Sequence, residues 1–119
     1  MESYKDLRVW QAAMDLAVRC YETTRSFPRE EAFGLTSQIR RAAASVAANI
    51  AEGHGRQTTN SFVHFLRVAQ GSLKELETHI ILSRRVELMT DTNAQPLLGL
   101  SNEIGKMLRS LIRNLENKQ

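Results

Sequence analysis

The fold is decided by Gln38-Ile39-Arg40-Arg41-Ala42-Ala43-Ala44-Ser45-Val46-Ala47-Ala48-Asn49-Ile50-Ala51-Glu52-Gly53. Ile39, Ala42, Val46 and Ile50 recur at steps of three and four residues, which places them along one stripe of an α-helix. Gly53 stands where a helix commonly ends. The stretch is therefore predicted to be helical.

The same helix carries no charged side chain from Ala42 to Ala51. A helix on the surface of a bundle usually covers its outer face with long charged residues. Two interpretations follow. Either the helix is central and its own chain wraps it, or one of its faces is buried against another copy of the protein.

Composition narrows the class of protein. A length of 119 residues with 42% hydrophobic residues fits one globular domain. A net charge of +3 favours an anionic partner only weakly. Cys20 is the only cysteine, so neither an internal disulfide nor a thiolate metal cage is expected.

The start of the chain lacks the apolar core of a secretory signal, and no run of apolar residues is long enough to span a bilayer. We expect a cytoplasmic protein without membrane contact.

Periodicity predicts one domain over residues 1–119, with helices at about 4–26, 31–53, 59–85 and 93–116. Trp10 falls on the apolar stripe of the first helix and is expected to be a core anchor. Thr92 or Asn93 is expected to cap the last helix. Short connectors make an all-α fold, an antiparallel up-down-up-down four-helix bundle, the simplest architecture.

Catalytic and metal motifs are weak. Di-metal bundles use Glu-x-x-His on two helices, whereas Glu75 and His79 are four residues apart and have no second copy. The pair Gly53 and Gly55 follows no strand and precedes no Gly-Lys-Ser/Thr motif, which argues against a phosphate loop. We expect no catalytic, cofactor-binding or metal-binding residues. A metal-binding or enzymatic bundle is the weaker alternative.

Two groups of residues are candidates for contacts. If the second and third helices are antiparallel, Arg41 lies level with Glu75, and the two either form an ion pair or both face solvent. Basic residues also gather at the end of the bundle that holds the 53–60 connector, beside Glu2, Asp6 and Glu116. In a ring this excess would be multiplied and could hold phosphates, although a solvated charged end is the simpler interpretation. The candidate nucleic-acid contacts are Lys5, Arg8, Arg56, Arg109, Arg113 and Lys118.

Several motifs resemble a family of bacterial four-helix bundles whose founding members are encoded in intervening sequences of 23S ribosomal RNA genes. These motifs are Leu7-Arg8-Val9-Trp10-Gln11, Phe27-Pro28, Phe33-Gly34-Leu35, Gln38-Ile39-Arg40-Arg41-Ala42, Asn49-Ile50-Ala51-Glu52-Gly53 and Gly71-Ser72. Arg85-Val86-Glu87-Leu88 departs from the family, which usually has a glycine-containing turn there.

The resemblance implies an antiparallel bundle that assembles into a homopentameric ring without established enzymatic activity. Residues expected to pack between helices or between copies are Arg41, Ser45, Asn49, Glu52, Gly71, Ser72 and Glu75. A distantly similar bundle, the accessory variability determinant of diversity-generating retroelements, is pentameric and binds nucleic acid, but that likeness is one of fold alone. We therefore expect a self-associating bundle, with its basic end as the candidate surface for binding RNA or DNA. The alternative is an adaptor for a partner protein without nucleic acid.

Overall fold

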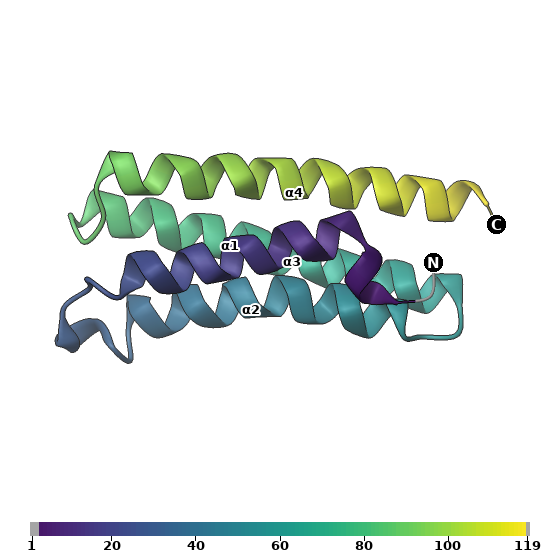
Figure 1. Ribbon diagram of the computed structural model, residues 1–119, viewed down its shortest axis with the longest axis horizontal. Coiled ribbons are helices and arrows are strands. Elements are labelled where there is room, and N and C mark those ends of the chain that lie inside the picture. Colours follow the sequence, from purple (N-terminus) through teal and green to yellow (C-terminus); the bar gives the residue numbers. More distant parts are fainter. Residues whose placement is uncertain (1–2, 119) are drawn as a thin grey trace.

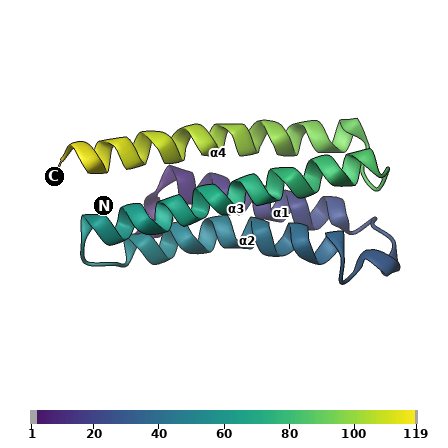
Figure 2. The same ribbon diagram turned by 180° about the vertical axis from the view of Figure 1, so that it is seen from behind.

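Four long helices make up the computed structural model, which describes residues 3–118. They are α1 (Arg8–Thr24), α2 (Leu35–His54), α3 (Thr59–Arg85) and α4 (Asp91–Asn117), and short 3-10 helices cover Tyr4–Asp6 and Arg29–Glu31. The helices alternate in direction along the bundle (Figures 1 and 2). The prediction of an all-α, antiparallel four-helix bundle is confirmed.

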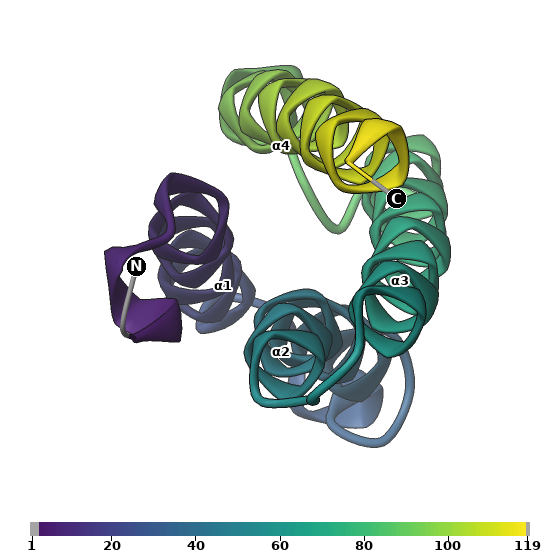
Figure 3. The same ribbon diagram turned by 90° about the vertical axis from the view of Figure 1, so that its right-hand side faces the viewer.

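The helices pack in the order in which the chain visits them. α1 contacts α2, α2 contacts α3, α3 contacts α4, and α4 returns to α1. Viewed along the bundle, α1 and α3 lie on opposite sides, with α2 and α4 between them (Figure 3). The molecule is a rod of 47 × 22 × 20 Å. Antiparallel neighbours with short connectors require this arrangement.

The core is aliphatic and runs the length of the rod. Each helix contributes one stripe, because apolar residues three and four apart share a face. The largest fully buried side chains include Leu16, Ile39, Ile50, Leu66, Leu73, Leu76, Ile80, Leu97, Ile104 and Leu108. On α3 the buried apolar residues recur at three- and four-residue steps and are Leu66, Ala69, Leu73, Leu76 and Ile80. The core therefore fixes which face of every helix remains at the surface.

Three helix starts differ from the sequence prediction. α1 begins at Arg8, because Leu7 is extended and separates it from the 3-10 helix that Ser3 caps. α2 begins at Leu35, because Gly34 has a non-helical backbone. The predicted cap of α4 is wrong: the Thr90 hydroxyl accepts a hydrogen bond from the Asn93 amide at 3.2 Å, so α4 begins two residues early.

The turn between α3 and α4 has a left-handed residue. Glu87 has a φ of 67°, a conformation that glycine adopts without steric cost. The amide of Leu88 donates to the Ser83 carbonyl at 2.9 Å, which closes the end of α3. A glutamate thus occupies the position where glycine usually ends a helix.

Candidate interaction surfaces

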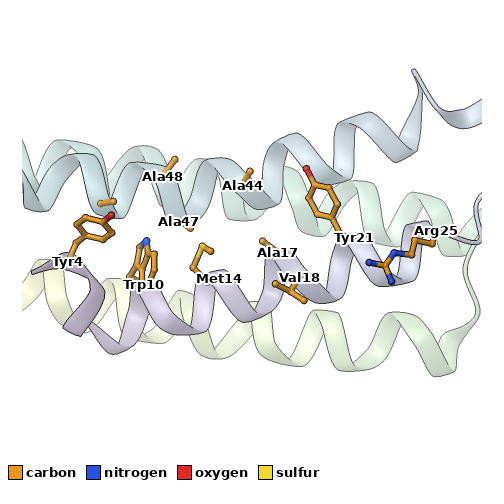
Figure 4. Close-up of a pocket in the computed structure, with 11 residues that line it drawn as sticks. Tyr4, Trp10, Met14, Ala17, Val18, Tyr21, Arg25, Ala44, Ala47 and Ala48 are labelled. Carbon is orange, nitrogen blue, oxygen red and sulfur yellow. The ribbon is translucent and has the colours of Figure 1, made fainter.

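An apolar groove lies between α1 and α2. The hollow has a volume of about 540 Å³. Its lining, which we call the α1–α2 groove, consists of Tyr4, Trp10, Met14, Ala17, Val18, Tyr21, Arg25, Ala44, Ala47, Ala48 and Ala51. In Figure 4, Trp10 and Met14 rise from α1 toward the alanines of α2. Arg25 is the only charged residue in this lining.

Helical spacing builds the groove. Trp10, Met14 and Val18 follow one another at four-residue steps and form one wall. On α2, alanines at three- and four-residue steps form the opposite wall, which is low because alanine side chains are short. Val18 is 53% exposed and Met14 is 40% exposed, so the groove is open to solvent. An apolar surface of the single chain is therefore uncovered.

Two sequence interpretations are corrected at this groove. Trp10 is not fully inside the core: it is partly buried, packs against the edge of the core, and meets the Tyr4 ring edge-on, with centroids 5.2 Å apart. Nor does the chain wrap α2, because Ala44 and Ala48 are exposed. The wide apolar arc of α1 extends past the core onto the surface, which explains the error for Trp10.

Polar side chains join α2 to α3. The hydroxyls of Ser45 and Ser72 are 2.8 Å apart and share a hydrogen bond. The Asn49 amide donates to the Ser45 carbonyl at 2.8 Å and to its hydroxyl at 3.0 Å. The structure thus brings three of the predicted packing residues together in one network. This network fixes the axial register of α2 relative to α3.

The other predicted packing residues do not join this network. Arg41 and Glu75 line the same shallow hollow, yet they form no ion pair. Glu75 instead lies 3.5 Å from Nε2 of His79 on its own helix. Glu52 lies 3.6 Å from Arg56. Gly71 is exposed on α3, and a Cβ built there would meet nothing within 4 Å.

Some of the basic end is neutralised. Arg56 pairs with Glu52 and covers the Phe65 ring at 4.8 Å. Arg67 on α3 contacts Glu116 at 3.2 Å. Within residues 3–118, the remaining candidates make no ion pair and are exposed; they are Lys5, Arg8, Arg109, Arg113 and Lys118. Glu2, one of the acids expected here, lies outside the described residues.

Titratable groups of the core give little chemistry. Burial raises the pKa of the Cys20 thiol to about 12, so the group remains protonated at neutral pH. The part of the chain that the structure describes has no group of three His, Cys, Asp or Glu placed to hold a metal ion.

Among the described residues, no helix combines the length and the apolar content that a membrane span requires.

Sequence reasoning missed two other ties between helices. Nε of Arg40 donates to the Thr24 hydroxyl at 2.9 Å, and that hydroxyl donates to the Cys20 carbonyl at 2.7 Å. Thr24 is the last residue of α1, whereas Arg40 is the sixth residue of α2, so counting outward from the connector would not have paired them. Ser101, fully buried on α4, donates to Glu77 on α3. The sequence positions of Ser101 and Glu77 likewise gave no signal that would have paired them.

Comparisons with known proteins agree with this architecture. The family model described as 23S rRNA-intervening sequence protein matches residues 5–110. A solved structure from Bacteroides thetaiotaomicron VPI-5482, described as a protein with unknown function from the S23 ribosomal protein family, is 29% identical. That match covers 87% of this chain and 97% of the other, with a TM-score of 0.79. No curated protein matches the chain. The resemblance seen in the motifs is confirmed, and the chain belongs to the 23S rRNA-intervening sequence protein family.

Proposed function

We propose that this protein is a non-catalytic bundle that associates with itself through the α1–α2 groove. The observation that carries the proposal is the open apolar lining of that groove, with Val18 53% exposed. Proteins that function as monomers rarely leave large contiguous apolar patches in water. Another copy of the chain is present wherever the protein is, and we propose that this second copy occupies the groove. The family resemblance favours a homopentameric ring.

The low alanine wall also suits an interface between helices. Ala44 and Ala48 are exposed, and small side chains let a facing helix approach closely. Covering Met14, Val18 and Tyr21 would remove apolar area from water, which is the main driving force of association.

Light scattering on the purified chain tests the proposal. The native mass at micromolar concentration should be several times the chain mass of 13.5 kDa. Ala48→Glu places a charge in the groove without disturbing the core, and it should reduce the native mass. Asn102→Glu, at an exposed position of α4, is the matched control and should leave the mass unchanged. A wild-type mass equal to one chain would refute the proposal.

A second function, nucleic-acid binding at the basic end, has one supporting observation. Five cationic side chains there have no ion-pair partner within residues 3–118, namely Lys5, Arg8, Arg109, Arg113 and Lys118. Unpaired cations attract phosphates and release counterions when they bind. RNA affinity should therefore fall steeply with added salt, and Arg8→Gln with Arg113→Gln should flatten that dependence. An RNA affinity that does not change with salt concentration would count against phosphate contacts and favour the adaptor alternative.

A further inference from the structure

A second groove lies between the start of α1 and the C-terminal half of α4. Its volume is about 480 Å³. The floor of this groove is apolar, and its residues are buried in the core or packed against it; they are Leu7, Val9, Met107 and Leu111. We call this hollow the α1–α4 groove.

The path of the chain before α1 leaves this groove open. Among the described residues, the 3-10 helix at Tyr4–Asp6 contacts α1 and α2 and has no contact with α4. Figure 1 shows this segment turning away from α4 toward α2. Met107 and Leu111 of α4 are therefore only half-buried.

The rim of the α1–α4 groove is cationic. Arg8 lies on the α1 side and forms no ion pair within residues 3–118. On the α4 side, Lys106, Ser110 and Asn114 follow one another at four-residue steps. Lys106 lies 3.8 Å from Glu103, but both side chains are 60% exposed, and such surface pairs contribute little. None of the described residues that line the groove is acidic. The rim therefore favours carboxylates on its occupant.

We propose that the α1–α4 groove binds an acidic, amphipathic helix of a partner protein. Apolar side chains three and four residues apart on such a helix would cover the floor, and its carboxylates would pair with Arg8 and Lys106. Lys106 to Asn114 spans about 12 Å at 1.5 Å per residue, so the groove accommodates about two turns of helix. The groove is separate from the α1–α2 groove, so this inference does not depend on self-association.

The floor distinguishes a protein partner from RNA. Apolar side chains offer no contact to phosphates, and the bases of single strands bind mainly by stacking on aromatic rings. None of the described residues in the lining is aromatic. A segment that carries apolar side chains beside carboxylates matches both the floor and the rim.

Selection from a displayed peptide library tests this inference. The bait is the whole chain, and the library consists of random peptides of about 16 residues, long enough to form a helix that spans the groove. Met107→Gln makes the floor polar without adding charge, so this variant is used to remove peptides that bind elsewhere. The remaining peptides should combine apolar residues at three- and four-residue steps with a net negative charge. The inference is wrong if no peptide remains, or if those that remain are neutral or basic.

Calorimetric titration of the best peptide locates the contact. Met107→Gln and Arg8→Glu should each weaken its binding roughly tenfold. The matched control is Arg19→Glu, which makes the same charge reversal at an exposed position about three turns farther along the same face of α1. It should leave the affinity unchanged, because a charge at that distance is screened by salt. Equal losses for Arg8→Glu and Arg19→Glu would show attraction by net charge alone and overturn the inference. Circular dichroism should show an intact fold for every variant.

Two measurements decide between this occupant and the others. Light scattering should give Met107→Gln and Arg8→Glu the native mass of the wild type. A lower mass would mean that another copy of the chain covers the groove, and the inference would fail. An oligouridine should bind Met107→Gln as it binds the wild type. If that uncharged change weakens RNA binding as much as peptide binding, RNA occupies the groove instead.

Discussion

Gly53 lies where α2 packs closely against α3. A Cβ there would lie 2.8 Å from Cβ of Phe65 and 3.0 Å from Cδ1 of Phe62. Gly53→Ala should therefore lower the free energy of unfolding by about 1–3 kcal/mol. Urea denaturation measures this loss. Gly55→Ala is the control, because its Cβ would make only ordinary contacts at 3.6 Å and 3.7 Å. Equal stability of the two variants would contradict the prediction.

Cys20 makes stability depend on alkaline pH. Burial raises its pKa from 9.0 to about 12 in the folded chain. Below pH 9 both states hold the proton. Between pH 9 and pH 12 only the unfolded chain releases it, so the free energy of unfolding should fall by up to about 1.4 kcal/mol per pH unit.

Denaturation with urea at about pH 8 and about pH 10 measures this effect. Other groups titrate in the same range, so the informative quantity is the difference between the wild type and Cys20→Ala. The variant should be less stable at both pH values because it leaves a cavity, but it should lose less stability on the change to alkaline pH. Parallel losses would assign the pH dependence to other residues.

At the scale of elements, the Ser45–Ser72 hydrogen bond couples α2 to α3. Ser72→Ala leaves the Ser45 hydroxyl bonded to Asn49. Ser45→Ala removes the hydroxyl that both Ser72 and Asn49 contact. A double-mutant cycle of the two changes should give a coupling free energy of about 0.5–1.5 kcal/mol. The same cycle with Thr78→Ala in place of Ser72→Ala should give none, because Thr78 bonds only within its own helix. A zero coupling for Ser45 and Ser72 would contradict the structure.

The ends of the elements show what sequence can and cannot predict. Residues 59–85 were predicted as a helix, and the structure gives Thr59–Arg85, because Thr58 supplies a local cap. The start of α1 was placed too early, since Leu7 is extended and the preceding 3-10 helix contacts α2. Contacts between distant segments decide such a boundary. Glu87 is similar: no pattern predicts a left-handed glutamate.

The candidate sites illustrate the same limit. Spacing placed Arg41 level with Glu75, and both line one hollow, yet Glu75 faces His79 on its own helix. Helical register follows from sequence, whereas the choice between two neighbouring partners depends on rotamers. Trp10 lies on a wide apolar arc, and a single helix does not reveal which part of such an arc faces the core. Sequence therefore predicted the fold better than the groove.

At the scale of the whole molecule, self-association links stability to concentration. A partner that binds only the folded chain raises apparent stability by mass action. The melting temperature of the wild type should therefore rise as the protein is concentrated from micromolar to hundreds of micromolar. Ala48→Glu should melt at one temperature throughout that range. Scanning calorimetry measures both, and a wild type that melts independently of concentration would contradict self-association.

The elongated shape of the rod, 47 Å long, has a consequence for such an assembly. Copies that join side by side around an axis parallel to their length would form a short tube with two unlike mouths. One mouth would carry the cationic ends, and the other would carry Phe33, which is 98% exposed in the connector before α2. A tube of this kind has a direction, so whatever meets it from one side would encounter a different chemistry from the other.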